Sequence, residues 1–358
     1  MERLSSHISS KILTIGPDYH NHRGGIGAVI AVYSRYFEVF NFIPSYEVGS
    51  QINKTYVFFI CTIKLVYTLI SNRKVKIIHI HGASNGSFYR KFIIFTICKI
   101  IFRKKIIYHI HGGGFKEFYN NRGVISKGLI RALLAKTDII ICLSQSWYEY
   151  YVNNFKIKSL VILPNIIDYP ENVQNIKKTS YTNFLFFGLI CEAKGIFDLV
   201  KVIAKNIENY KSRIRLFIGG NGEVQRLEDL INKNHIEDTV QFLGWVNNIE
   251  KINVLNNADI FILPSYNEGL PISILEAMSY GKAIISTDVG GISEIVKKNV
   301  NGLLIEPGNF NQIEGAINTF IENPILIKEY GDISKQMIQK HLPHSVLKEL
   351  EGYYKSLL

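Results

Sequence analysis

The sequence has little of what marks several common classes of protein. It contains four cysteines in 358 residues, and no two of them form a CxxC pair. A zinc ribbon or a disulfide framework is therefore not expected, and a reducing compartment fits this cysteine usage. The first residues, MERLSSHISSKILTIG, lack the long apolar core and the small-residue cleavage site of a secretory signal. These absences predict a cytoplasmic protein.

Acidic residues are scarce in the first half of the chain. Residues 1–170 hold 22 Lys and Arg against 8 Asp and Glu, a net charge of +14, whereas residues 171–358 have a net charge of −3. A basic half indicates an anionic partner, such as nucleic acid or an anionic membrane, although a general lysine bias gives the same numbers. No nucleic-acid-binding motif accompanies the charge, so we expect no nucleic acid partner.

Short apolar runs that end in Gly, Ser or Pro alternate with longer amphipathic stretches along the whole chain. This alternation predicts βα units, and hence parallel sheets with helices on both faces. The pattern stops at 165–182, a polar stretch typical of a linker. We therefore predict an α/β protein with two doubly wound, Rossmann-like domains, residues 1–170 and 171–342. A helix over 343–358 is expected to pack back across the hinge. The ligand site should lie in a cleft between the domains, at the carboxyl ends of the strands.

The expected strands are short apolar runs in both halves. They cover residues 11–16, 76–82, 105–112, 138–144 and 159–164 in the first half, and 183–188, 214–219, 239–243, 259–263 and 282–286 in the second.

Glycine and histidine follow the strands of the first half. Gly25 lies in an Arg-Gly-Gly-Ile-Gly segment directly before a predicted helix, where backbone amides can approach a phosphate. The spacing is not the G-x-G-x-x-G of a dinucleotide site, so no NAD is expected. Two strands end in His-Ile-His, at 79–81 and 109–111. No carboxylate or cysteine completes a ligand set, so we expect strand-end histidines and no metal site. His111, directly before three glycines, is the best candidate to line a ligand pocket.

The strand-end loops of the second half carry one lysine and two glutamates of interest. Lys194 begins a predicted helix, where its charge opposes the helix dipole unless an anionic ligand binds there. Glu268 lies in the loop PSYNEGLP, and Glu276 lies on the following, otherwise apolar helix. A carboxylate at position 276 needs a hydrogen-bond partner, such as the hydroxyls of a sugar. Together with a further glycine loop over 288–291, these loops indicate a phosphorylated sugar or a nucleotide as the ligand.

These segments resemble the retaining glycosyltransferases of family 4, which have the GT-B fold. The most specific feature is a pair of glutamates separated by seven residues in EGLPISILE, and the surrounding PSYNEGLPISILEAMSYGKAIISTDVGGISEIV is similar throughout. FFGLICEAKG, LFIGGNGE, VQFLGWV, NGLLIEPGN, RGGIGAV, HIHGG and VILPNIID extend the resemblance over nearly the full chain.

The resemblance implies a role for each candidate residue. Glu276 would bind the ribose of a nucleotide sugar, and Glu268 would contact the donor sugar. Gly269 and Leu270 would offer backbone amides to the sugar and phosphate, Lys194 would bind the diphosphate, Gly25 would lie close to it, and His111 would line the donor-sugar pocket. Glu268, His111 and Lys194 are the expected catalytic residues. The family has Arg where this chain has Leu189, so one of two usual diphosphate cations is missing. Another basic residue, such as Arg23, would have to substitute for it.

The implied function is retaining transfer of a hexosyl group from a nucleotide sugar, with UDP favoured over GDP. The acceptor would be a glycan or a polyprenyl-diphosphate-linked glycan in the synthesis of a surface polysaccharide. Because no Asp-x-Asp occurs, we expect neither a metal nor another cofactor. A nucleotide-sugar epimerase of the same fold and a non-catalytic nucleotide-sugar-binding subunit remain alternatives.

Two stretches of the basic half combine aromatic, aliphatic and basic residues, namely residues 55–70 and 88–105. Neither reaches ~20 uninterrupted apolar residues, so neither is expected to span a bilayer. Both occupy helix positions of the βα pattern and could simply pack on a buried sheet. The alternative is peripheral binding to anionic lipid on the inner face of the plasma membrane, with the lysines and arginines at the headgroups.

Overall fold

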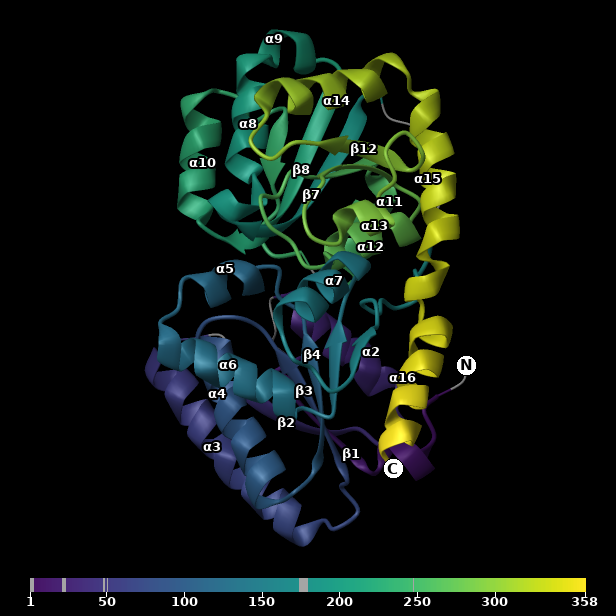
Figure 1. The fold of residues 1–358 in the computed structure, drawn as a ribbon. Coiled ribbons are helices and arrows are strands. Elements are labelled where there is room, and N and C mark those ends of the chain that lie inside the picture. The colour runs from purple at the N-terminus through teal and green to yellow at the C-terminus, as the bar shows by residue number, and fades with distance from the viewer. Residues whose placement is uncertain (1–2, 21–23, 48, 50, 174–179, 247) are drawn as a thin grey trace. The chain divides into compact units, whose positions relative to one another are not determined.

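The computed structural model describes the chain except for residues 1–2, 21–23, 48, 50, 174–179 and 247. The chain divides into two compact units (Figure 1). Unit 1 contains Met1–Asp168 together with Lys340–Leu358, and unit 2 contains Tyr169–Gln339. The C-terminal segment thus belongs to unit 1 by its contacts.

Unit 1 is built on a six-stranded parallel sheet with the order β2-β1-β3-β4-β5-β6. Its strands are β1 (Ile12–Pro17), β2 (Asn41–Tyr46), β3 (Ile77–Gly82), β4 (Lys105–Ile110), β5 (Ile139–Cys142) and β6 (Leu160–Ile162). The strand order reverses between β1 and β3, which makes the carboxyl ends of these two strands a binding position in folds of this type. Strand β2 was not predicted. It contains Pro44, which an edge strand tolerates because the missing N–H faces away from the sheet.

Helices cover both faces of this sheet. They are α1 (Ser6–Ser9), α2 (Gly25–Tyr36), α3 (Gln51–Ser71), α4 (Gly86–Thr96) with the π-helical turn η1 (Ile97–Ile101), α5 (Phe115–Asn120), α6 (Val124–Lys136), α7 (Gln145–Asn154) and α16 (Pro343–Leu357). The core under α3, α4 and α6 is a continuous cluster of buried aliphatic and aromatic side chains. The C-terminal helix α16 is tied to the sheet of unit 1, because the buried Tyr354 hydroxyl lies 2.7 Å from His79 Nδ1.

Unit 2 contains a second six-stranded parallel sheet with the order β12-β11-β10-β7-β8-β9. Its strands are β7 (Thr182–Ile190), β8 (Ile214–Gly222), β9 (Val240–Phe242), β10 (Ile260–Leu263), β11 (Ala283–Thr287) and β12 (Gly302–Ile305). This is the order of a doubly wound nucleotide-binding sheet, and it reverses between β7 and β10. The predicted fold class of two doubly wound α/β domains is therefore confirmed.

The helices of unit 2 follow its strands in the expected alternation. They are η2 (Glu192–Lys194), α8 (Ile196–Lys205), α9 (Ile207–Tyr210), α10 (Val224–Lys233), α11 (Asn248–Asn257), α12 (Ile272–Ser279), α13 (Ile292–Ile295), α14 (Phe310–Glu322), α15 (Ile325–Met337) and η3 (Ile338–His341), the last of which ends in unit 1. Helix α8 buries Ile196, Leu199, Val200 and Ile203, the spacing of a helix with one apolar face. Helix α14 begins at an Asn309 cap, whose side chain accepts a 3.1 Å hydrogen bond from the backbone N–H of Gln312.

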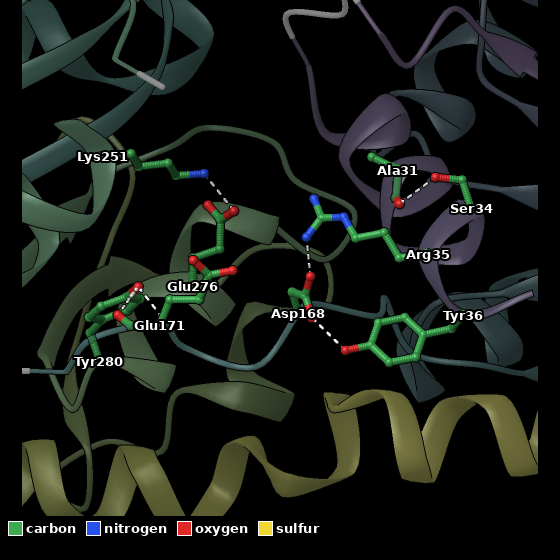
Figure 2. Close-up of polar contacts among 9 residues, drawn as sticks. All are labelled: Ala31, Ser34, Arg35, Tyr36, Asp168, Glu171, Lys251, Glu276 and Tyr280. Carbon is green, nitrogen blue, oxygen red and sulfur yellow. Dashed lines mark hydrogen bonds and ion pairs between the residues drawn. The ribbon is translucent and has the colours of Figure 1, made fainter. Parts of the chain in front are cut away.

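The segment that joins the units is fastened at both of its ends (Figure 2). In unit 1, Asp168 pairs with Arg35 and accepts a 2.7 Å hydrogen bond from the Tyr36 hydroxyl, so it is held to the end of α2. In unit 2, the Tyr280 hydroxyl donates to the Glu171 carbonyl at 3.0 Å and accepts from the Glu171 N–H at 3.2 Å. Each unit thus fixes its own end of the connection through side chains of its own helices.

Candidate active site

Lys194 and Glu268 meet where the strand order of unit 2 reverses. Lys194 ends the short helix that follows β7, and Glu268 lies in the loop after β10. The Lys194 Nζ donates to Glu268 Oε1 at 2.5 Å, and the Ser265 hydroxyl donates to the same oxygen at 2.9 Å. Glu268 is only 7% exposed, so its charge needs these partners. Within the described residues Glu268 Oε2 accepts no hydrogen bond, which leaves that oxygen available to a ligand.

The loop that carries Glu268 is packed backbone to backbone against two other strand-end loops. Gly290 has a φ of +58°, and a Cβ at this position would lie 1.9 Å from the Glu268 carbonyl oxygen. The next residue, Gly291, donates its N–H to the Gly269 carbonyl at 2.8 Å. On the other side, a Cβ on Gly195 would lie 2.1 Å from the Pro264 carbonyl oxygen. The glycine loops identified in the sequence therefore position the Glu268 loop, including Gly269 and the buried Leu270.

Glu276 lies on α12, directly after this loop, and has a lysine partner. The Lys251 Nζ on α11 donates to Glu276 Oε1 at 2.5 Å (Figure 2). Both side chains are partly exposed, at 24% for Glu276 and 31% for Lys251. The expectation that a carboxylate on this apolar helix needs a partner is met by an ion pair. Lys251 was missed because one lysine on an amphipathic helix gives no signal in the sequence.

Gly25 and His111 belong to unit 1. Gly25 is the first residue of α2 and follows β1. Arg23, the suggested substitute for a missing cation, lies outside the described residues. His111 follows β4, where its N–H donates to the Gly82 carbonyl at 3.0 Å. Its Nε2 lies 2.8 Å from His81 Nδ1. Gly25 thus begins the helix after β1, and His111 lies at the end of β4 in the same sheet.

His111 is one of four stacked histidines, of which His79 and His81 lie on β3, His109 lies on β4, and His111 directly follows β4. The ring centroids of His109 and His111 lie 4.0 Å apart, and those of His79 and His81 lie 4.4 Å apart. Burial lowers the pKa of His79 and of His111 to about 3, and it holds the pKa of His81 and His109 well below the usual value. All four imidazoles are therefore neutral at physiological pH.

The histidine cluster also has the geometry of a potential metal site. Ligand nitrogens of His79, His81 and His109 lie within 4.8 Å of one another. The set contains no carboxylate or thiolate, however, and the buried Lys91 adds positive charge near His81. Burial lowers the pKa of Lys91 to about 7, and its ammonium donates to the Ser45 hydroxyl. A cation here would find neutral imidazoles as its ligands and no anionic group. The absence of a metal at these histidines stays a prediction.

Two further sequence predictions concern β7 and β8. Leu189, at the position where the family has Arg, is 48% exposed near the end of β7. The segment Gly219–Gly222, of which only Gly219 belongs to an expected strand, is the last part of β8 and pairs with β7. A Cβ on Gly220 would lie 2.0 Å from the Gly188 carbonyl oxygen. These glycines therefore allow the two strands to approach each other closely.

Comparison with known protein families identifies the class of the chain. The model for glycosyl transferases group 1 matches residues 169–339, and the model for glycosyltransferase family 4 matches residues 35–169. The first match covers the described site of unit 2, and the second covers most of unit 1. The chain belongs to the group 1 glycosyltransferases of the family 4 type, and the family predicted from the sequence is confirmed.

Individual relatives and solved structures agree with this class. An uncharacterized glycosyltransferase of Methanocaldococcus jannaschii is 27% identical over 323 residues, which are 85% of this chain and 79% of that protein. The UDP-Gal:alpha-D-GlcNAc-diphosphoundecaprenol alpha-1,3-galactosyltransferase of Escherichia coli is 26% identical over 279 residues, 72% of this chain and 68% of that protein. Anabaena HepE in complex with UDP-glucose matches with a TM-score of 0.76 at 16% identity, over 97% of this chain and 100% of that one. The sucrose-phosphate synthase of Thermosynechococcus elongatus also has a TM-score of 0.76 at 16% identity, over 97% and 99%. The fold is GT-B, as predicted.

We expect Gly290→Ala to destabilise unit 2 by about 2–4 kcal/mol, because the new methyl group meets a backbone oxygen at a positive φ. Thermal or urea unfolding measures this loss. Gly315→Ala on α14 is the matched control, since no atom lies within 4 Å of a Cβ there. Its higher helix propensity should leave stability unchanged or raise it by up to about 1 kcal/mol. Equal effects of the two substitutions would show that the contact with Glu268 is not tight.

The neutral histidine cluster predicts a pH dependence of stability. In the folded state His79 and His111 stay unprotonated down to about pH 3, and burial holds the pKa of His81 and His109 well below its usual value. The unfolded chain protonates all four imidazoles near pH 6.5. The unfolded state therefore binds more protons in this range, and stability falls as the pH decreases below 6.5.

We expect His109→Phe to make the melting temperature less dependent on pH below 6.5. Removing one such histidine removes up to about 1.4 kcal/mol per pH unit of this dependence. The exposed His344 gives the control variant His344→Phe, which should leave the slope unchanged. An unaltered slope in His109→Phe would mean that His109 titrates alike in both states.

Proposed function

We propose that this glycosyltransferase moves a hexosyl group, with retention of configuration, from a nucleotide sugar to a glycan or lipid-linked acceptor. The observation that carries the proposal is the Lys194–Glu268 pair at the point where the sheet of unit 2 reverses its order. Sheets of this kind bind their ligands at that point. The Lys194 ammonium there can bind a diphosphate, and the carboxylate oxygen of Glu268 that accepts no hydrogen bond among the described residues can bind sugar hydroxyls.

The donor roles in unit 2 follow from which atoms are still available. Glu268 uses Oε1 for Lys194 and Ser265, so Oε2 is left for a donor-sugar hydroxyl. Glu276 likewise uses Oε1 for Lys251, and it is proposed to bind the ribose hydroxyls of the nucleotide. Gly269 and Leu270 lie between these two carboxylates in the sequence. Their backbone N–H groups would donate hydrogen bonds to the sugar and the phosphate.

Lys194 is proposed to stabilise the leaving nucleoside diphosphate without a metal. As the bond between the anomeric carbon and the diphosphate breaks, negative charge grows on the phosphate oxygens, and a pre-positioned ammonium stabilises it. The acceptor hydroxyl would attack from the same face and pass its proton to the departing oxygen. This path requires no glutamate nucleophile, unlike the path of retaining glycosidases.

Unit 1 is proposed to supply two further groups. Gly25 begins α2, where the free N–H groups of the first turn favour a phosphate. His111, whose burial keeps it neutral, would line the donor-sugar pocket as a hydrogen-bonding group rather than as a cation. The acceptor is proposed to bind to this unit as well.

The donor and the acceptor are proposed from the relatives. The Escherichia coli relative is named for UDP-Gal and for a diphosphoundecaprenol-linked acceptor. A UDP-sugar is therefore favoured over a GDP-sugar, and a polyprenyl-diphosphate-linked glycan is the favoured acceptor. Such an acceptor would place the protein at the cytoplasmic face of the plasma membrane.

Release of nucleotide from a panel of UDP- and GDP-sugars, with and without lipid-linked glycan, tests the proposal. Binding without acceptor-dependent release would favour a non-catalytic subunit, and interconversion of the sugar would favour an epimerase.

We expect Glu276→Ala to weaken nucleotide binding by about 1.5–3 kcal/mol, because a charged hydrogen-bond acceptor for the ribose is lost. Calorimetry with UDP measures the affinity, and thermal unfolding checks the fold. Lys251→Ala separates two explanations, since it breaks the same ion pair but keeps the carboxylate. If both variants lose affinity equally, the ion pair rather than the ribose contact is responsible.

We expect Lys194→Ala to lower turnover by about 2.7–4 kcal/mol in the activation free energy, the cost of removing one group that stabilises a developing charge. Added magnesium should not restore the rate, and a chelator should not inhibit the unaltered protein. Lys201→Ala, on the exposed face of α8, is the matched control and should retain activity. A rate that survives in Lys194→Ala would assign the diphosphate to a different residue.

A further inference from the structure

Helix α3 of unit 1 has two apolar faces, and only one of them is covered. Cys61, Leu65 and Leu69 lie in the core of the unit at 1%, 0% and 4% exposure. On the other face, six large apolar side chains are each more than half exposed. These six residues, the outer stripe of α3, are Ile52 (84%), Tyr56 (63%), Phe59 (62%), Ile63 (51%), Tyr67 (71%) and Ile70 (64%).

The outer stripe of α3 is continuous and straight. Its residues follow one another at intervals of three or four. At about 100° per residue they fall within an arc of roughly 80°, nearly opposite to the buried face. From Ile52 to Ile70 the stripe is about 27 Å long, at 1.5 Å per residue. A contiguous apolar surface of this length is unusual on a monomeric protein and marks an interaction site.

The segment of the chain that contains the outer stripe has charged residues of one sign. Residues 48–116 contain 12 Lys and Arg and no Asp or Glu. Lys64 is exposed on α3 itself, and Arg73, Lys74 and Lys76 are exposed just after its C-terminal end. Lys104 joins them, because its Nζ donates to the Val75 carbonyl at 2.6 Å. The partner of the stripe should therefore offer an apolar region bordered by negative charge.

Helix α4 contributes less to this surface than its sequence indicates. Of the residues over 88–105, Phe88, Ile94 and Phe95 are at most 2% exposed and belong to the core. Lys91, which was expected among the headgroup-binding cations, is itself buried at 2%. Most apolar side chains of α4 therefore pack against the buried sheet, as one of the two interpretations of residues 88–105 expects. The outer face of α3, in contrast, is exposed.

Helix α3 is better suited to lie along a membrane than to cross one. By length and composition, Ile52–Ser71 would be enough to span a bilayer, and only 17% of the hydrophobic window is buried. However, Cys61, Leu65 and Leu69 are part of the core of unit 1. Moving α3 into a bilayer would expose that core. A helix with one apolar face in the protein and a second one outside fits the plane of a membrane interface.

We propose that the outer stripe of α3 docks unit 1 onto the surface of an anionic lipid bilayer. Its aliphatic and Phe side chains would enter the acyl region, and Tyr56 and Tyr67 suit the interface. A second copy of the chain fits less well, because two such surfaces would bring like charges together with no acidic residue between 48 and 116 to pair with them. The inference rests on the membrane association proposed above but not on the transfer reaction.

Co-sedimentation of the purified full chain with vesicles tests the docking surface. Phosphatidylcholine vesicles, with and without phosphatidylglycerol, are compared at low and high salt. We expect binding to anionic vesicles that is at least tenfold tighter than to neutral ones and that weakens with salt. The assay needs no donor or acceptor. A negative result would therefore not contradict the proposed donor site, and a wrong donor site would not affect the vesicle result.

The combined variant Ile52→Gln, Phe59→Gln and Ile63→Gln tests the stripe directly, since glutamine retains high helix propensity. It should lose at least tenfold in binding to anionic vesicles while keeping its melting temperature. The matched control is Ile249→Gln, Val300→Gln and Ile325→Gln, which removes exposed apolar residues of unit 2 and should bind normally.

A second pair of combined variants tests the contribution of charge. It compares Lys64→Glu, Arg73→Glu and Lys74→Glu in unit 1 with Lys205→Glu, Lys233→Glu and Lys298→Glu in unit 2. Only the first set should weaken binding.

Four outcomes would overturn the proposal. Three concern the vesicles: no binding, equal binding to neutral and anionic vesicles, or binding that the α3 variants leave unchanged. The fourth is self-association, detected by light scattering and abolished by the α3 variants, in a protein that does not bind vesicles. The last outcome would identify a second copy as the occupant of the stripe.

Discussion

The site in unit 2 depends on one ion pair, between Lys194 after β7 and Glu268 after β10. Adjacent strands at a reversal of strand order send their loops to opposite faces of the sheet, and this leaves the strand ends uncovered. The ion pair joins the two loops across that gap. Because Gly290 and Gly195 have no Cβ, their backbones can approach the carbonyl oxygens of Glu268 and Pro264 closely enough to fix the geometry.

Both carboxylates of the site are balanced by lysines from other elements. Glu268 is mostly buried and would be costly as an unpaired charge, and Glu276 is paired with Lys251 on α11. In each carboxylate one oxygen is engaged, and among the described residues the other accepts no hydrogen bond. A ligand would therefore find both side chains already held in position, so less conformational entropy is lost when it binds.

The sequence was sufficient for ten of the twelve strands, because buried strands such as β4 and β10 are continuous apolar runs. It was insufficient for β2, which contains a proline, and for β12, a short edge strand that is only partly buried. Lys194, Glu268 and Glu276 could be proposed as site residues because a charge stands out in a strand-end loop or on an apolar helix.

Lys251 and the burial of Lys91 could not be predicted, because they depend on which helices pack together. The same holds for α3. Its sequence is apolar almost all round, and only the packing of Cys61, Leu65 and Leu69 shows which face is left exposed. Three-dimensional packing thus determines which lysines become partners and which apolar faces become surfaces.

Hydrogen–deuterium exchange of the full chain with and without UDP tests the central claim most directly, because it reports binding at each loop separately. The account predicts that UDP slows exchange of backbone amides over 192–196 and 268–276, the segments that carry Lys194, Glu268 and Glu276, and leaves 51–71 unchanged. Binding of UDP without protection of these two segments would contradict the placement of the donor at the Lys194–Glu268 pair.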